Sequence, residues 1–211
     1  NRLNEKVVAK MPEEGRKVAE LMLNWIVLMD PPDHTRVRKV LQKAFTPRSI
    51  MKMQEYAEEV VNEALDALEG RREIDLLEDF AHNIPTNILA KMMGLPTEDF
   101  EKIKEWTRDL NKLVFIDINE PNRHKSALEG IQNMSDYLHG VFQERRKNPG
   151  DDLISALIVA NENGILTEDE LVAQCILLFQ AGHESTANSI SGSMISLLSH
   201  PEEFEKLKNK P

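Results

Sequence analysis

The amino-acid sequence predicts a mainly α-helical fold with little β-structure, and three observations favour this class. Apolar residues recur at spacings of three and four along most of the 211 residues, which is the period of an amphipathic helix. No stretch alternates apolar and polar residues long enough to predict a sheet. The composition, with 41% hydrophobic and 29% charged residues, is that of a globular protein. We therefore expect one compact helical domain.

Proline marks the start of the first three predicted helices, because it is tolerated in the first helical turn. Pro12 and the two glutamates after it predict a helix that runs towards residue 25. After the Asp-Pro-Pro break at residues 30–32, Pro32 predicts a second helix to residue 44. Pro47 starts a third, and Gly70 is expected to end it in the left-handed conformation.

The middle of the chain combines a short strand candidate with further helices. Residues 73–76 are the best strand candidate in the sequence. Helices are expected over residues 85–94, 97–113, 126–146 and 152–160. Residues 114–121 contain exposed apolar residues and are predicted to form a loop. This loop is either a mobile lid over an apolar ligand or a plain connection between two helices.

The last main element is predicted to be a helical rod that crosses the domain. Thr167 and Glu170 form a capping box, Thr-x-x-Glu, and no proline follows until Pro201. A helix of some 30 residues would extend ~45 Å at about 1.5 Å per residue. Residues 175–179 are apolar on every side of the helix, so the first half is expected to be buried. Cys175 is accordingly predicted to be a small buried hydrophobe.

A polar cluster, residues 181–186 (Ala-Gly-His-Glu-Ser-Thr), follows the apolar run directly. A glycine in a helix costs ~1 kcal/mol relative to alanine, so Gly182 is expected to let a flat ligand approach the backbone. Ser185 can donate a hydrogen bond to the carbonyl of Ala181 and open the helix locally. Glu184 would then deliver protons from solvent to a groove beside the Ser185 hydroxyl. The alternative is a polar patch where the helix reaches the surface.

Several other kinds of site are excluded or disfavoured. A zinc hydrolase motif, His-Glu-x-x-His, would need a second histidine where Ala187 stands. A single cysteine excludes a disulfide scaffold and a cysteine-rich zinc site. The nine glycines form neither a dinucleotide fingerprint nor a phosphate-binding loop. The net charge of −10 argues against nucleic acid as a partner. Four other histidines are predicted to be surface or structural residues: His82, His124, His139 and His200.

The sequence predicts a cytoplasmic protein without a membrane span. The longest nearly apolar run, residues 21–29, is far shorter than the ~20 residues that a spanning helix needs. No basic-then-apolar leader is visible, and the chain opens at Asn1, so the natural start is expected to lie upstream. The single cysteine fits a reducing compartment.

Residues 33–48 form a basic island in this acidic chain, with five cations against one acid: Arg36, Arg38, Lys39, Lys43 and Arg48 against Asp33. His34 and Arg38 lie four residues apart on the predicted helix, so one face can bind a carboxylate or phosphate through both. Lys39 and Lys43 form a neighbouring stripe that can meet an acidic protein partner. The alternative is a solvated basic helix.

Taken together, these motifs resemble the bacterial cytochrome P450 monooxygenases over nearly the whole chain. Residues 29–38 (Met-Asp-Pro-Pro-Asp-His-Thr-Arg-Val-Arg) and 43–48 (Lys-Ala-Phe-Thr-Pro-Arg) resemble the third lettered helix of that family and its exit. Residues 181–186 resemble the oxygen-binding groove of its long central helix. Residues 75–96 and 151–154 resemble segments that lie between the two. The resemblance implies the central-helix portion of the cytochrome P450 fold.

The resemblance also implies a cofactor, heme b, and the residues that would bind it. His34 and Arg38 would bind the heme propionates, whereas Ala181 and Gly182 would line the groove for dioxygen. The axial cysteine thiolate of the family belongs to a C-terminal region that is expected to lie outside this chain. Cys175 cannot substitute, because it precedes the groove on the same helix.

The implied reaction is insertion of one oxygen atom from O2 into a small lipophilic substrate. Glu184 would be the acid of the proton relay, and Ser185 its hydroxyl in place of the more usual threonine. Residues 21–29, residues 113–121 and the first half of the rod would contact the substrate. The stripe of Lys39 and Lys43 would face a ferredoxin- or flavodoxin-type redox partner.

Residues 1–211 are therefore expected to form a partial cytochrome P450 domain that lacks the N-terminal sheet and the C-terminal heme-ligand region. Such a segment is not expected to be active unaided. Two alternatives stay open. One is a heme-free helical module that binds small molecules or other proteins. The other is a family relative with peroxide-driven or isomerase chemistry, against which the pair of Glu184 and Ser185 speaks.

Overall fold

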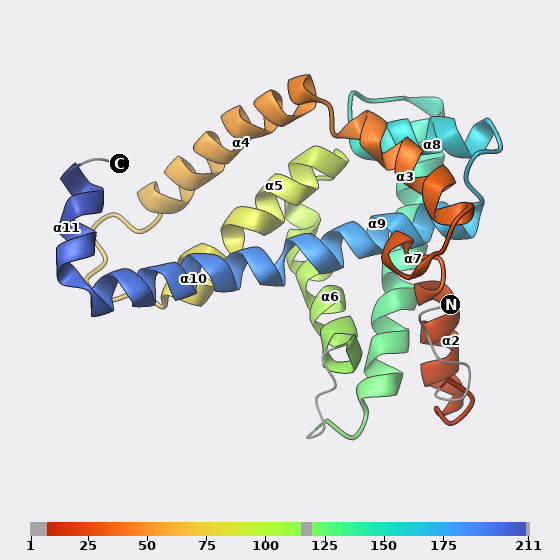
Figure 1. Cartoon of the computed structure of the whole chain (residues 1–211), viewed down its shortest axis with the longest axis horizontal. Coiled ribbons are helices and arrows are strands. Elements are labelled where there is room, and N and C mark those ends of the chain that lie inside the picture. Colours follow the sequence, from red (N-terminus) through yellow and green to blue (C-terminus); the bar gives the residue numbers. More distant parts are fainter. Residues whose placement is uncertain (1–7, 115–119, 210–211) are drawn as a thin grey trace.

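The computed structural model describes residues 8–114 and 120–209, and every regular element in this part of the chain is helical (Figure 1). The mainly α-helical class predicted from the sequence is thus confirmed. The α-helices are α2 (Glu13–Met22), α3 (Asp33–Ala44), α4 (Pro47–Asp66), α5 (Asn83–Met93), α6 (Phe100–Val114), α7 (Arg123–Lys147), α8 (Leu153–Glu162), α9 (Glu168–Gly182), α10 (Glu184–Ser199) and α11 (Pro201–Asn209). Three short helices complete the set: η1 (Ile26–Leu28), η2 (Leu76–Ala81) and η3 (Thr97–Asp99).

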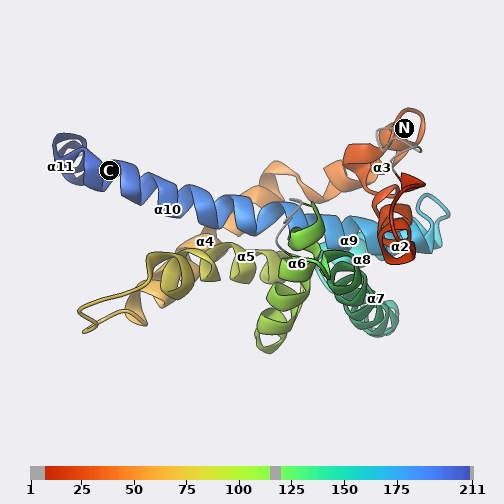
Figure 2. The ribbon, with the colours of Figure 1, turned by 90° about the horizontal axis from the view of Figure 1, so that it is seen from below.

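The helices α9 and α10 form one long rod through the molecule (Figure 1). Figure 2 shows α5, α6 and α7 on one side of this rod and α3 on the other. The helices α6 and α7 pack against each other along their length, and α2 packs against α7. The rod that the sequence predicts is therefore present, and the core lies around its first half.

The proline starts of the first helices are confirmed. Pro12 caps α2, Pro32 precedes α3 and Pro47 begins α4. The third helix is shorter than expected, since it ends at Asp66 in a turn, although Gly70 does adopt a positive φ of 79°.

The strand predicted for residues 73–76 is wrong. These residues are not paired, and a short π-helix, η2, starts at Leu76 instead. The reason is the side chain of Asp75, which accepts hydrogen bonds from the backbone N–H groups of Leu77 and Glu78. Such a cap favours a helical turn over an extended strand.

The later helices lie where the sequence places them. Gly94, with a φ of 72°, ends α5 in the left-handed conformation. Asp152 caps α8 by accepting from the backbone N–H of Ser155 at 2.8 Å. The predicted loop over residues 114–121 falls mostly on residues 115–119, which lie outside the described residues.

The first half of the rod is the centre of the core, as its sequence predicts. Thr167 and Glu170 form the expected capping box at its start. Cys175 and Ile176 are fully buried, together with Phe142 of α7 and Leu110 of α6. Burial raises the pKa of the Cys175 thiol, so this side chain is protonated and serves packing.

Candidate functional site

The rod is interrupted at one residue, His183, which separates α9 from α10; we call this point the helix break. Its backbone angles, φ −85° and ψ −71°, lie at the edge of the helical region. The sequence predicts an opening here, because a glycine and a hydroxyl residue flank this position. The interruption lies inside the polar cluster of residues 181–186.

Side-chain hydroxyls bond back to the preceding turn on both sides of the break. Ser185 donates to the carbonyl oxygen of Ala181 at 2.9 Å, as the sequence predicts. Thr186 donates to the carbonyl of Gly182 at 3.0 Å, and Ser189 to that of Ser185 at 2.8 Å. Such back-bonds compete with the helical ladder and bend helices, so this series accounts for the break locally.

The break presents two different faces. Ala181 and Ser185 are exposed and Glu184 is half-buried, so an acid and a hydroxyl border an open strip of small side chains. His183 and Ala187 point the other way and are buried. An acid that reaches both solvent and the strip can transfer protons between them.

Gly182 has a packing role that the sequence does not reveal. A Cβ at this position would lie 2.9 Å from Cδ1 of Leu89, a side chain of α5. The absent side chain therefore lets α5 approach the rod closely at the break. The atoms that a Cβ would meet are the end of a flexible side chain, so this contact accounts for the glycine only in part. The predicted role of Gly182 in ligand approach stays a prediction.

A buried pair of histidines lies behind the break. The rings of His183 and His82 are 5.0 Å apart between centroids and tilted by 32°. Burial is the main cause that lowers the pKa of His183, and the neighbouring His82 lowers it further. The ring of His183 is therefore neutral at pH 7. Within the described residues, Nε2 of His183 and Nδ1 of His82 are buried without a hydrogen-bond partner.

This histidine pair is the main feature of the site that sequence reasoning missed. His82 was expected to be a surface or satisfied structural residue, but it is buried and one ring nitrogen has no partner in the described part of the chain. Its neighbours are charged: Nε2 of His82 lies 3.8 Å from Glu78, which also contacts Lys104 at 3.5 Å. No local pattern relates His82 to His183, because tertiary packing alone brings them together.

One arginine of the basic island fastens α3 to the start of the rod. Arg36 donates to both carboxylate oxygens of Glu170, at 2.6 and 2.8 Å, and to the carbonyl of Ile165 at 2.6 Å. It also pairs with Asp33 at 2.8 Å. Arg36 is therefore committed to structure, and it fixes the orientation of the other basic residues on α3.

The other basic residues of the island with described side chains take no part in this anchor. His34 is half-buried, and Arg38 is exposed four residues later on the same face. Lys39 and Lys43 are exposed on the neighbouring stripe. None of these four side chains has a hydrogen-bond or ion-pair partner within the described residues. The anion-binding roles predicted for both stripes stay predictions.

The predicted site residues form two groups in the structure. Ala181, Gly182, Glu184 and Ser185 share the turn around the break. His34 and Arg38 lie on α3, which Arg36 attaches near the beginning of the same rod. No hydrogen bond joins the two groups within the described residues. A ligand that touches both would have to bridge α3 and the second part of the rod.

The described parts of the chain offer no competing metal site. In the described ranges, no cluster of three or more His, Cys, Asp or Glu side chains could hold a metal ion. The same ranges contain no helix with both the length and the apolar character needed to cross a lipid bilayer.

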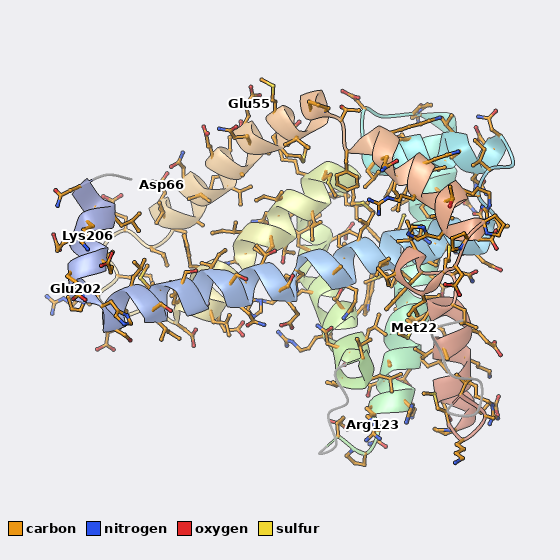
Figure 3. All side chains as sticks on the ribbon, viewed as in Figure 1. Met22, Glu55, Asp66, Arg123, Glu202 and Lys206 are labelled. Atoms are coloured by element: carbon orange, nitrogen blue, oxygen red, sulfur yellow. The ribbon has the colours of Figure 1, made fainter. Side chains whose placement is uncertain are left out.

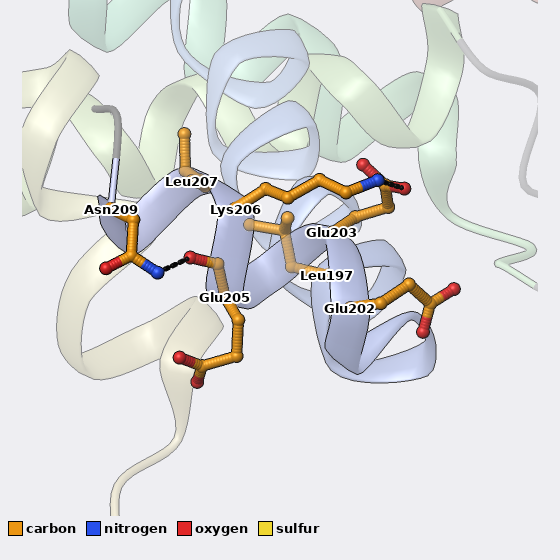
Figure 4. A pocket seen from close by; sticks show the side chains of 7 residues that line it. All are labelled: Leu197, Glu202, Glu203, Glu205, Lys206, Leu207 and Asn209. Atoms are coloured by element: carbon orange, nitrogen blue, oxygen red, sulfur yellow. Dashed lines mark hydrogen bonds and ion pairs between the residues drawn. The ribbon is translucent and has the colours of Figure 1, made fainter.

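A hollow of about 700 Å³ lies between α10 and α11 (Figure 4). Of its charged lining residues, Lys206 contacts Glu203 at 2.6 Å, and Glu205 contacts Lys208, which is outside the lining, at 2.8 Å. Exposed pairs of this kind leave no convergent set of groups for a ligand. The break therefore remains the candidate site.

Known proteins show what this arrangement is similar to. Residues 18–210 match the family model described as cytochrome P450. A relative from Priestia megaterium, cytochrome P450 CYP107DY1, is 37% identical over 198 residues, which cover 92% of this chain and 47% of that protein. The vitamin D(3) 25-hydroxylase of Pseudonocardia autotrophica is 34% identical and is matched over 45% of its length. The chain spans about half the length of the curated relatives it matches.

Solved structures agree with this result. The crystal structure of P450BioI, in complex with an acyl carrier protein carrying hexadec-9Z-enoic acid, superposes with a TM-score of 0.86 at 33% identity. The match covers 95% of this chain and 52% of that one. CYP267B1, a myxobacterial cytochrome P450 in complex with myristic acid, has a TM-score of 0.83 at 34% identity and is covered over 51% of its chain.

Proposed function

This chain belongs to the cytochrome P450 family, and from that premise we propose that the whole protein is a heme-dependent monooxygenase. It inserts one oxygen atom from O2 into a small lipophilic substrate. The observation that carries this proposal is the helix break, where the carboxylate of Glu184 and the hydroxyl of Ser185 border an exposed strip. An acid and an alcohol at one opening of a buried helix are the groups that controlled proton delivery needs.

The described residues fit heme both at the helix break and on α3. Ala181 and Ser185 are small and exposed, so they leave room for a flat ring beside the rod. His34 and Arg38 supply two unpaired groups on one face of α3 that can donate to carboxylates. When bound, heme supplies the redox chemistry of oxygen activation, with a thiolate ligand expected outside this chain.

Glu184 and Ser185 divide the proton chemistry between them. Glu184 is half-buried, so it can take a proton from solvent and release it on the side of the strip. Ser185 is held by its bond to the Ala181 carbonyl, and its exposed oxygen can accept a further hydrogen bond. Behind them, the neutral ring of His183 and the buried Ala187 close the turn. The proposed proton route therefore runs through Glu184.

Part of one predicted substrate-contacting segment, residues 21–29, lies against the rod. Gln174, fully buried on α9, accepts from the backbone N–H of Ile26 at 3.2 Å and donates to the carbonyl of Asn24. This holds residues 24–26 on the apolar half of the rod. Half-buried apolar side chains there, such as Ile26 and Met29, favour a lipophilic substrate.

The stripe of Lys39 and Lys43 supports an acidic redox partner of the ferredoxin or flavodoxin type. Both side chains are exposed on α3 and have no partner within the described residues. Unpaired cations on an otherwise acidic chain attract an acidic protein and orient it, chiefly through the association rate.

A carbon monoxide difference spectrum of the whole protein tests the proposal. Reduced, thiolate-ligated heme should give the red-shifted Soret band that is characteristic of this ligand. A heme-free helical module would show no Soret absorbance, and a Soret band at the position of a nitrogen-ligated heme would also contradict the proposed enzyme.

The role of Ser185 has a separate test. Ser185→Ala should waste electrons as hydrogen peroxide and lower product per electron several-fold, because the hydroxyl beside the groove is lost. Ser189→Ala is the matched control, since Ser189 makes the same kind of back-bond one turn later. Equal coupling in the two variants would remove Ser185 from the proton chemistry.

A further inference from the structure

Two aromatic side chains outside the helix break meet between α6 and α7. The rings of Trp106 and Tyr137 are 5.8 Å apart between centroids and tilted by 53°. Both side chains are half-buried and pack against the core. A Cβ at Gly130 would lie 2.8 Å from the backbone oxygen of Trp106, so this glycine lets α7 approach α6 closely. Indole and phenol rings are among the side chains that lose a single electron most readily.

The hydroxyl of Tyr137 has a proton acceptor in place. It donates to the carboxylate of Asp99 at 2.9 Å, and Asp99 also accepts from the exposed Lys102 at 3.0 Å. Burial is the main cause that raises the pKa of Tyr137, and the bond to Asp99 raises it further. The hydrogen bond from Lys102 is the main cause that lowers the pKa of Asp99. At pH 7 the phenol is therefore protonated and the carboxylate is ionised, as a proton transfer between them requires.

The chain has two tyrosines, and the other one has the opposite surroundings. Tyr56 on α4 lies beneath the ammonium of Lys91, whose Nζ is 4.2 Å from the ring centroid. Glu59 pairs with Lys91 at 2.6 Å and offsets its charge only in part, because the ammonium is the group placed over the ring. A cation there opposes the loss of an electron from the ring. In Figure 3, Glu55 marks this part of α4, away from the region between α6 and α7.

The two tryptophans differ in a similar way. Trp25 is 4% exposed, and its Nε1 is buried without a hydrogen-bond partner in the described part of the chain. A positive charge formed on this ring would be desolvated and uncompensated. Trp106 instead has an electron donor, Tyr137, against its ring. Its helix, α6, is also bonded to the rod one residue before the exposed strip begins, since Gln180 donates to Asn111.

We propose that Trp106 and Tyr137 form a redox pair that carries oxidising equivalents from the rod to the protein surface. One-electron oxidation of Trp106 gives an indole radical cation, which takes an electron from Tyr137 while the phenolic proton passes to Asp99. The products are a neutral Trp106, a neutral phenoxyl radical and a protonated Asp99, so no net charge is created. A soluble one-electron reductant then returns the electron to Tyr137, and Asp99 returns the proton.

In the whole protein the oxidising equivalents come from the proposed oxygen chemistry, so the role of the redox pair in the cell rests on the proposed function. The redox pair removes these equivalents when no substrate consumes them, and this protects the residues around the helix break from oxidation. The electron and proton transfers between Trp106, Tyr137 and Asp99 require no heme. A chemical oxidant can therefore test the redox pair separately.

The experiment is flash photo-oxidation of the full chain with ruthenium tris-bipyridine, with cobalt(III) pentaammine chloride as the electron acceptor. Electron paramagnetic resonance after rapid freezing measures the yield of phenoxyl radical. Tyr137→Phe should lower this yield several-fold, whereas Tyr56→Phe, the matched control, should leave it nearly unchanged. Denaturation in urea should abolish the difference, because both tyrosines then have the same surroundings. Equal yields from the two folded variants would overturn the proposal.

Trp106→Phe tests the first step of the transfer. The yield of radical on Tyr137 should fall several-fold, because phenylalanine is much harder to oxidise than tryptophan. Trp106→Tyr keeps an oxidisable ring at the same position and should restore most of the yield. An unchanged yield in Trp106→Phe would mean that Tyr137 is oxidised directly, which would contradict the redox pair.

Asp99→Asn tests the proton transfer. An amide oxygen can accept a hydrogen bond but does not take up the proton as a carboxylate does, so the radical yield at pH 7 should fall several-fold. Asp99→Glu should retain most of it, and equal yields in these two variants would exclude Asp99 as the proton acceptor. The carbon monoxide spectrum of the whole protein reports separately on the proposed function. A radical on Tyr137 without a heme-thiolate spectrum would retain the redox pair and overturn only its proposed source of oxidant.

Discussion

The two halves of the rod, α9 and α10, follow each other directly and yet differ in almost every respect. Most of the 15 residues of α9 are buried, including the polar Glu170, Gln174 and Gln180. Of the 16 residues of α10, only Ala187 is buried. Large apolar side chains of α10, such as Ile195 and Leu198, are 65% and 63% exposed. The helix break separates these two environments.

The difference shows how the chain combines stability with access. The helices α5, α6, α7 and α8 all contact α9, so its backbone position is fixed by packing. The exposed strip of the site begins only where this cover ends, at Ala181 and Ser185. A site built on a rigid element can present reactive groups accurately while its other side stays open to ligands.

Truncation of an apolar side chain should give the largest difference in stability between the two halves of the rod. Ile176→Ala in α9 should lower the free energy of unfolding by about 2–5 kcal/mol, because the cavity that remains cannot collapse. Ile195→Ala in α10 should change it by no more than about 0.5 kcal/mol, since this side chain is 65% exposed. Urea denaturation followed by circular dichroism measures both. Similar losses would mean that α10 is packed in solution.

The ion pair at the start of the rod should give the next largest effect. Glu170→Gln removes the main partner of Arg36 and should cost about 1–3 kcal/mol at pH 7. Arg36 lowers the pKa of Glu170, so the stabilisation exists above the unfolded carboxyl pKa of about 4.3 and is lost as the pH falls further.

The difference between wild type and Glu170→Gln should therefore shrink below about pH 4. Glu13→Gln is the control, because Glu13 pairs with Lys17 at 2.7 Å on the exposed side of α2. A loss that does not change with pH would show that Glu170 acts through packing alone.

The capping box at the N-terminal end of α9 tests whether this end of the rod is anchored more firmly than the other. Thr167→Ala removes a hydrogen bond to the backbone N–H of Glu170 and should cost about 1 kcal/mol in thermal or chemical unfolding. Ser199→Ala near the end of α10 removes a hydroxyl that bonds only to the carbonyl of Ile195, and it should have no measurable effect. Equal effects would contradict the unequal anchoring of the two ends.

The smallest expected effect concerns the break itself. His183 is buried with a lowered pKa, so the unfolded chain binds a proton more readily than the folded one near pH 6. The stability of the protein should fall as the pH is lowered through about 6.5, the unfolded value. His183→Phe should reduce this decrease, whereas replacement of the exposed His200 by alanine should not. Melting curves between pH 7.5 and 5.5 measure the difference.

Most of the fold could be predicted from interactions between residues that are close together in the sequence. Proline starts, the capping box of Thr167 and the turn at Gly94 are properties of neighbouring residues, so they could be predicted from the sequence. The strand at residues 73–76 was wrong because the side chain of Asp75 caps a helical turn, and this competes directly with extended pairing. An Asp before two apolar residues fits either structure until its hydrogen bonds are known.

The site was predicted only in part, for a similar reason. The bond from Ser185 to Ala181 spans four residues and follows from helical geometry. The contact between His183 and His82 and the bond between Arg36 and Glu170 join segments far apart in the chain. The close fit of Leu89 against Gly182 is likewise a tertiary contact, so the glycine alone could not reveal it.

Heme content per chain in matched variants of the whole protein tests the central claim most directly. We propose that His34 and Arg38, on one face of α3, bind heme and that the exposed strip at the helix break leaves room for it. A His34→Leu/Arg38→Gln variant should lose most of its heme, whereas Lys39→Gln/Lys43→Gln on the neighbouring stripe should keep it. Equal heme retention in the two double variants would contradict the account.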